Sequence, residues 1–204
     1  MHNAQNTIDI PAGIRLVVLD MDGTVYSKPH MTRRMLLTQW HHLPYMVHER
    51  LTRAYRRRQV GKHDAPDKLL RADHPTHYSR WYKHSYLPSM VKIIGRYYRP
   101  QAWLHPLLDE CRQRQIPVVI LSDYEAVTDK LHILGLKEEM FDGVYATSEV
   151  GTLKPDPRLG TYVMEQVYPD AAKRPAWKDV LFVGDRPDTD GALAEALGAQ
   201  YLRV

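Results

Sequence analysis

The sequence predicts an α/β protein built on a doubly wound parallel sheet with a helical insertion. Three continuously apolar runs of strand length indicate the sheet, and segments of helical periodicity lie between them. Each run ends in an aspartate, at the edge where sheets of this kind bind ligands. The long stretch after the first run is helical in its periodicity and contains no comparable strand run, which indicates the insertion.

The predicted strands follow from the apolar runs. The first run covers residues 14–20 (IRLVVLD), the second 116–123 (IPVVILSD) and the third 179–185 (DVLFVGD). Strands that are buried on both faces are apolar throughout, so these three are expected in the middle of the sheet. Weaker strand signals are GVYAT near Val144 and YLRV from Tyr201.

The predicted helices of the core have apolar residues every three or four positions. Two of them end at glycines, Gly135 and Gly198, which stand where C-terminal caps are expected. Cys111 falls in the apolar series of the first helix, so we expect it to be buried rather than reactive. The four segments are Leu104–Cys111, Val127–Leu134, Leu159–Gln166 and Leu193–Leu197.

We expect three parts in the chain. Residues 1–13 form a mobile N-terminal tail, residues 14–29 and 100–204 form a catalytic core, and residues 30–99 form a helical cap. Two apolar series at helical spacing support the cap: Met90, Ile93, Ile94 and Tyr97, and also Val47, Leu51 and Tyr55.

Charge separates the cap from the core. Residues 31–100 hold fifteen Lys or Arg against four Asp or Glu, an excess of +11; the remainder holds thirteen against twenty, or −7, which together give the net charge of +4. A basic segment of this kind attracts anions.

The location of the protein is expected to be cytoplasmic. No run approaches the roughly 20 apolar residues that cross a bilayer, and the first residues lack the basic and apolar regions of a signal peptide. The single cysteine cannot form an internal disulfide, which agrees with a reducing compartment. We therefore expect no membrane association.

Polar residues gather where the predicted strands end. Several carboxylates in one place repel each other and raise their own pKa values, unless a hard cation with oxygen ligands such as Mg²⁺ binds them. An ammonium group and a hydroxyl in the same place can donate hydrogen bonds to phosphate oxygens. The candidate residues are Asp20, Asp22, Thr24, Ser122, Lys154, Asp185 and Asp190.

These residues stand in four motifs, which are DMDGT at Asp20, Ser122 after a hydrophobic strand, LKPDP at Lys154 and GDRPDTD at Asp185. In this order the motifs resemble those of the haloacid dehalogenase (HAD) superfamily, specifically its phosphatase branch. The resemblance covers residues 14–29 and 101–204, and it implies a HAD-like Rossmannoid core. The insertion resembles the family's helical cap only in position and helical character.

The resemblance implies that phosphoryl transfer passes through an aspartyl-phosphate. Asp20 is the expected nucleophile. Asp22 is the expected general acid and then general base, a role that requires a raised pKa. Thr24 supports the loop, while Ser122 and Lys154 hold the phosphoryl oxygens.

The resemblance also implies a magnesium site and a substrate class. Asp20, the backbone carbonyl of Asp22, and Asp185 would bind Mg²⁺, with Asp190 either a further ligand or a residue just outside the ligands. The expected substrate is a small phosphorylated anion, hydrolysed as a phosphate monoester.

Other functions remain open at this point. A phosphomutase uses the same aspartyl-phosphate but keeps it from water. A dehalogenase is disfavoured, because relatives with that chemistry lack the second aspartate, here Asp22. Nucleic-acid binding through the basic insertion is a further alternative, disfavoured because no recognition motif is present. The sequence leaves the substrate and the oligomeric state open. Solvated helix faces or loops are expected for Arg56, Arg57, Arg58, Asp123, Asp156 and Asp188.

Overall fold

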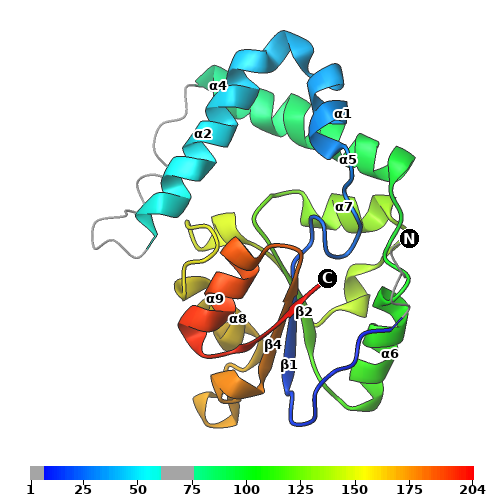
Figure 1. Ribbon diagram of the computed structural model, residues 1–204, viewed down its shortest axis with the longest axis vertical. Coiled ribbons are helices and arrows are strands. Elements are labelled where there is room, and N and C mark those ends of the chain that lie inside the picture. Colours follow the sequence, from blue (N-terminus) through cyan, green and yellow to red (C-terminus); the bar gives the residue numbers. More distant parts are fainter. Residues whose placement is uncertain (1–6, 61–75) are drawn as a thin grey trace.

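Five parallel strands form one sheet in the computed structural model, which describes residues 7–60 and 76–204 (Figure 1). The strand order is β3-β2-β1-β4-β5, so the chain builds outward from β1 in one direction and then returns to build outward in the other. This reversal at β1 confirms the doubly wound α/β fold. The strands are β1 Leu16–Leu19, β2 Val118–Ser122, β3 Gly143–Ala146, β4 Val180–Gly184 and β5 Gln200–Arg203.

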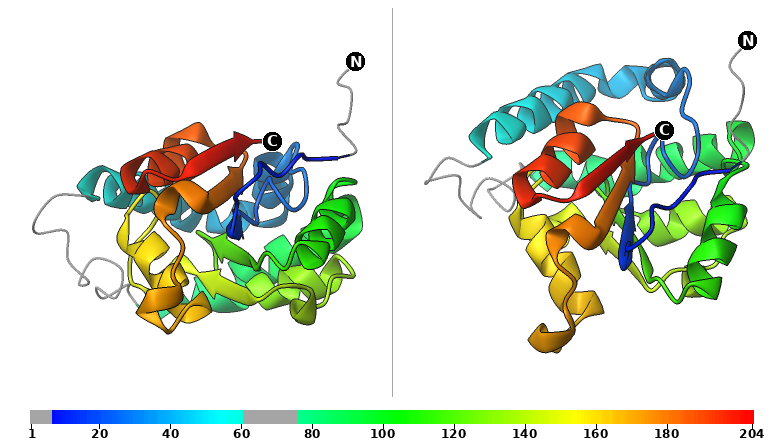
Figure 2. Two further views of the ribbon diagram at one scale, coloured as in Figure 1. Left: turned by 90° about the horizontal axis from the view of Figure 1, so that it is seen from below. Right: turned by 60° about the horizontal axis from the view of Figure 1, so that its bottom comes forward.

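The central strands are apolar throughout because helices cover both faces of the sheet (Figure 2). In β1, Val17 and Leu19 pack into one core cluster with side chains of α6 and α7, whereas Leu16 and Val18 pack into the other with side chains of α8 and α9. The helices of the core are α6 Leu104–Gln113, α7 Val127–Ile133, α8 Arg158–Val167 and α9 Ala192–Leu197.

Glycines end two of these helices, as predicted. Gly135 and Gly198 both have a positive φ, 76° and 72°, which is the left-handed conformation that favours glycine after a helix. Cys111 is fully buried in α6, and burial raises the pKa of its thiol to about 12. It is therefore a packing residue rather than a reactive thiol.

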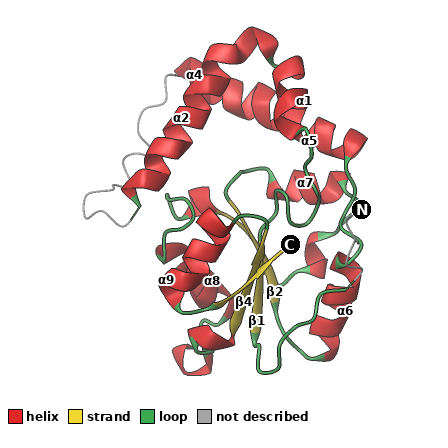
Figure 3. Ribbon diagram, in the orientation of Figure 1, coloured by secondary structure: helices red, strands yellow, loops and turns green. Residues whose placement is uncertain are grey.

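Every described element between β1 and β2 from residue 31 to residue 97 is helical, and this helical insertion lies beyond one end of the sheet (Figures 1 and 3). Two short helical turns, Trp40–His42 and Tyr82–Tyr86, link its helices. The helices are α1 Met31–Thr38, α2 Leu43–Gln59, α4 Thr76–Trp81 and α5 Leu87–Tyr97.

The two ends of the helical insertion lie side by side on the core. Tyr26 and Pro100 form an antiparallel bridge, and the backbone N–H of Gln101 donates to the carbonyl of Val25 at 2.8 Å. Within the insertion, buried Trp81 donates its indole N–H to the side-chain oxygen of Gln39 at 3.0 Å. The helices are therefore joined by a polar contact as well as by apolar packing.

One apolar series of the insertion is helical but faces solvent. Val47, Leu51 and Tyr55 lie along α2 as their spacing predicts, yet their side chains are 48%, 64% and 53% exposed. The face of α2 that turns toward the core instead carries Glu49 and Arg53.

The N-terminal segment is packed where the structure describes it. Ile8 and Ile10 are buried, and Arg114 donates hydrogen bonds to the carbonyls of Ile10 and Pro11, both at 2.9 Å. The prediction of a mobile tail is therefore wrong for residues 8–11, because two isoleucines bury apolar surface there. Residues 1–6 of that tail, and residues 61–75 of the predicted cap, lie outside the described residues. Among the described helices, none combines the length and the apolar content needed to cross a bilayer.

Candidate active site

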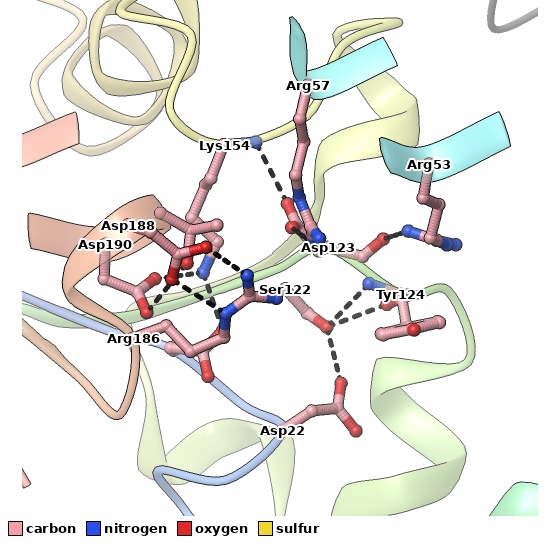
Figure 4. A network of polar contacts seen from close by, with 12 residues as sticks. Asp22, Arg53, Arg57, Ser122, Asp123, Tyr124, Lys154, Arg186, Asp188 and Asp190 are labelled. Atoms are coloured by element: carbon pink, nitrogen blue, oxygen red, sulfur yellow. Dashed lines mark hydrogen bonds and ion pairs between the residues drawn. The ribbon is translucent and has the colours of Figure 1, made fainter. Parts of the chain in front are cut away.

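The predicted site residues meet at the carboxyl edge of the parallel sheet. Asp20 follows β1, Ser122 ends β2 and Asp185 follows β4, so parallel pairing brings the three ends together. Lys154 comes from the loop after β3, and Asp190 from the helical turn Pro187–Gly191 after β4. The close-up in Figure 4 shows Asp22, Ser122, Lys154 and Asp190 around one centre.

Lys154 connects two carboxylates in the interior. Its ammonium Nζ lies 2.6 Å from Asp20 Oδ1 and 2.6 Å from Asp190 Oδ1, and it donates to the carbonyl of Leu121 at 3.0 Å. Burial alone would lower the pKa of Lys154, but the charges of Asp20 and Asp190 outweigh burial and raise it well above its ordinary value. The ammonium is therefore permanently charged.

The pKa of Asp20 is raised in this arrangement. Burial is the largest cause; the Lys154 ammonium opposes it, and the charge of Asp190 adds to it. A nucleophilic carboxylate must be ionised, so further positive charge beside Asp20 would favour the reactive form. Thr24 fixes the other oxygen, since its hydroxyl donates to Asp20 Oδ2 at 3.1 Å and accepts from the backbone N–H of Asp185 at 3.0 Å.

Asp22 is surrounded by donors. Lys130 Nζ lies 2.6 Å from Asp22 Oδ2, Ser122 Oγ donates to the same oxygen at 3.1 Å, and the Tyr26 hydroxyl donates to Oδ1. Burial raises the pKa of Asp22, but the charge of Lys130 and the hydrogen bonds from Lys130 and Tyr26 outweigh burial and hold the pKa below its ordinary value. The expected raised pKa for Asp22 is therefore wrong for this arrangement, in which Asp22 is ionised.

Ser122 is completely buried, and its hydroxyl is engaged by neighbours. Besides the contact with Asp22, its Oγ lies 2.8 Å from the carbonyl of Tyr124 and accepts from the N–H of Tyr124 at 3.1 Å (Figure 4). In this conformation Ser122 orients Asp22 and the loop after β2.

The carboxylates suit a divalent cation. Asp20, Asp185 and Asp190 each offer an oxygen, and the three oxygens lie within 4.8 Å of one another. Asp185 Oδ1 is buried and has no hydrogen-bond partner among the described residues, as expected of an oxygen that lacks its cation. A small, hard cation such as Mg²⁺ prefers such ligands. The residues present therefore fit Mg²⁺.

Arginines of α2 reach the core beside this site. Arg57 Nη2 lies 2.8 Å from Asp123 Oδ2, and Arg53 Nη1 donates to the carbonyl of Asp123 at 2.7 Å. The other carboxylate oxygen of Asp123 accepts from the backbone N–H of Lys154 at 3.1 Å (Figure 4). Asp123 thus joins the helical insertion to the loop that carries Lys154.

Cavities open at this boundary, and those beside the carboxylates differ in size. A small one of about 30 Å³ is lined by Asp20, Asp185, Lys154 and Arg57 among others. A larger one of about 410 Å³ extends from Asp22 and Lys28 under the insertion, where Arg50 and Met46 of α2 line it. The larger cavity has room for a small organic group beside Asp22 and Lys28.

Sequence reasoning missed four residues of this region: Tyr26, Lys28, Asp123 and Lys130. A signal existed for Lys130, because it lies on the same helix face as Val127 and Leu134, where a lysine is unexpected unless it is paired. Asp123 follows a strand directly, where an aspartate is ordinarily a cap or loop residue. The spacing of residues in the sequence does not identify Tyr26 or Lys28 as site residues. Their contacts with Asp22 form only because the loop after β1 folds back on itself.

Comparisons with known proteins agree with the fold and the motifs. Residues 14–198 match the family model described as haloacid dehalogenase-like hydrolase. The search of curated proteins gave no match. Solved structures at 16% identity share the fold. A HAD phosphatase from Thermococcus onnurineus has a TM-score of 0.62, with 94% of this chain and 86% of that chain covered. CbbY from Rhodobacter sphaeroides in complex with phosphate has a TM-score of 0.64, with 92% of this chain and 84% of that chain covered. A putative beta-phosphoglucomutase from Thermotoga maritima has a TM-score of 0.59, again with 92% of this chain and 84% of that chain covered.

Proposed function

Because the chain belongs to the haloacid dehalogenase-like hydrolases, we propose that it hydrolyses a phosphate monoester of a small metabolite through an aspartyl-phosphate on Asp20. The observation that carries this proposal is the convergence of Asp20, Asp190 and Lys154 at one edge of the sheet, with Lys154 Nζ 2.6 Å from both carboxylates. A nucleophile and a permanent positive charge are the two groups that phosphoryl transfer needs most.

In the first half of the reaction, a carboxylate oxygen of Asp20 attacks phosphorus and the ester oxygen leaves. Thr24 and Lys154 each hold one oxygen of Asp20, which limits its rotation. Fixing the attacking group in this way lowers the entropic part of the barrier. Lys154 also offers positive charge to the phosphoryl oxygens. The Ser122 hydroxyl, which donates to Asp22 in the structure, would donate to a phosphoryl oxygen instead when the substrate is bound.

Asp22 serves both halves of the reaction. An incoming phosphate adds negative charge beside Asp22, which raises its pKa and favours the protonated form that can protonate the leaving oxygen. Once that proton has gone, the carboxylate accepts a proton from the water that attacks the aspartyl-phosphate. Lys130 and Tyr26, which contact Asp22, stabilise this ionised form.

Magnesium completes the charge balance in this proposal. Asp20, Asp185, the carbonyl of Asp22 and, directly or through water, Asp190 would hold the ion. When bound, Mg²⁺ offsets negative charge on the phosphoryl oxygens during transfer.

We propose that residues 30–99 act as the cap over the site. The larger cavity lies between α2 and the loop after β1, so the insertion offers the walls for the organic part of the substrate. Its arginines would reduce the repulsion between an anionic substrate and the carboxylates of the core.

The assay that tests the proposal measures phosphate release from a panel of phosphorylated metabolites and from an aryl phosphate. With Mg²⁺ present we expect turnover. Excess chelator should lower it by at least about 100-fold, because the charge stabilisation from the metal amounts to several kcal/mol. Restored Mg²⁺ should recover the activity, whereas Ca²⁺ should inhibit, since its longer and looser coordination misplaces the attacking oxygen.

Full activity in excess chelator would contradict the role given to the acidic cluster. Conversion of a substrate into its isomer with little release of phosphate would identify a phosphomutase instead.

Arg57 and Arg58 offer a matched test of the cap. Arg57 lines the site and pairs with Asp123, whereas its neighbour Arg58 is exposed on α2. Arg57→Met should lower kcat/KM for the best metabolite by roughly tenfold, and by more at low ionic strength where charges are less screened. Arg58→Met should leave kcat/KM nearly unchanged.

For a small aryl phosphate, Arg57→Met should lower kcat/KM less, because such a substrate has few groups that the cap could contact. Equal losses in the two variants would mean that the arginines act only through the net charge of the helix.

A further inference from the structure

Lys28 places an ammonium group inside the acidic cluster. Its Nζ donates to the backbone carbonyl of Asp22 and lies 3.0 Å from Asp185 Oδ2. Gly23 makes this approach sterically feasible: a Cβ there would overlap both Lys28 Nζ and the Asp185 carboxylate, and the φ of Gly23 is 109°. The loop after β1 is therefore shaped so that the lysine can enter.

One oxygen that Lys28 contacts, the backbone carbonyl of Asp22, is assigned to magnesium above, and the other belongs to the Asp185 carboxylate, whose Oδ1 is the oxygen offered to the metal. An ammonium group and a divalent cation that share the Asp22 carbonyl and one carboxylate lie so close together that their positive charges repel each other. Lys28 and Mg²⁺ therefore cannot both occupy this position.

Lys28 has room to leave. Its side chain is 33% exposed, and the residue lines both the small cavity at the carboxylates and the larger cavity under the insertion. A lysine stem has several rotatable bonds, so the ammonium can turn into the larger cavity without a change in the backbone. In this second position it would face the space where an anionic substrate binds.

We propose that Lys28 is a tethered cation that occupies part of the magnesium site and is displaced when the metal binds. This inference rests on the proposed function, since it uses the same metal site. Its consequence is a higher magnesium requirement: the free energy of removing Lys28 from Asp22 and Asp185 is subtracted from the free energy of metal binding.

The experiment measures the affinity of the full-length protein for Mg²⁺ alone by titration calorimetry, after removal of bound metal. Lys28→Met keeps the length of the side chain but removes the charge, and Lys28→Gln is a second variant in case methionine perturbs the loop. Lys92→Met, an exposed lysine of α5, controls for the loss of one positive charge elsewhere. Circular dichroism checks that each variant is folded.

We expect both Lys28 variants to bind Mg²⁺ about threefold to fivefold more tightly than the unaltered protein, which corresponds to the loss of one partly exposed ion pair. Lys92→Met should change the affinity by less than about twofold. Equal or weaker affinity in both folded Lys28 variants would overturn the inference while leaving the magnesium site intact. Absence of Mg²⁺ binding in all proteins would overturn the metal site itself, and the inference with it.

Discussion

Replacing Asp20 by asparagine should reduce phosphatase turnover by more than about 10⁴-fold, since loss of a covalent nucleophile in other enzymes has effects of this order. Asparagine has nearly the same shape, but its amide is not an anion and cannot form the acyl phosphate. The backbone contact of this residue, from its N–H to the carbonyl of Val183 at 2.9 Å, is unaffected, so the fold should persist.

The measurement is a steady-state assay on protein whose folding is verified by circular dichroism. Asp109→Asn serves as the control, because Asp109 lies on α6 with a side chain that is 65% exposed. That variant should keep full activity. Substantial turnover in folded Asp20→Asn protein, free of contaminating phosphatase, would refute the aspartyl-phosphate mechanism.

Replacing Lys154 by methionine should impair both stability and activity. The substitution leaves the carboxylates of Asp20 and Asp190 buried without the ammonium that contacts both. Removing one partner from a buried ion pair typically lowers the free energy of unfolding by about 3–5 kcal/mol. Loss of a charged group that stabilises the transition state should reduce kcat by a further ~10² to 10³-fold.

Urea denaturation and the phosphatase assay measure these two effects separately. Lys173→Met is the control, since the side chain of Lys173 is 76% exposed and its ion pair with Asp170 is at the surface. An unchanged unfolding free energy in Lys154→Met would show that the buried contacts do not stabilise the protein. Full activity would exclude Lys154 from phosphate binding.

The sequence was a good predictor of the elements and a poor predictor of their electrostatic surroundings. The strands were predictable because burial on both faces of β1, β2 and β4 requires continuous apolar runs. Parallel strands alone placed Asp20 and Asp185 at the same edge of the sheet, and the direct pairing of β1 with β4 brings them together there. The pKa of Asp22 was not predictable, because its largest opposing cause is Lys130, which lies 108 positions further along the chain.

Periodicity also has a limit that α2 illustrates. The spacing of Val47, Leu51 and Tyr55 correctly predicts a helix, but it does not reveal whether that face packs against the protein. In the structure the arginines of the opposite face contact the core, through Asp123, and the apolar face is exposed. The order of strands in the sheet was likewise beyond the sequence, because no local pattern encodes which strands become neighbours.

The bridge between Tyr26 and Pro100 bears on how such a protein can diversify. The chain leaves the core and returns to it at adjoining points, so recombination that exchanges the intervening gene segment leaves every strand connection intact. On the proposed function, descendants would thereby acquire new substrate ranges while keeping Asp20 at the end of β1. The exchange has one constraint, since a transplanted segment must again provide a basic partner for Asp123, whose other oxygen holds the backbone of Lys154.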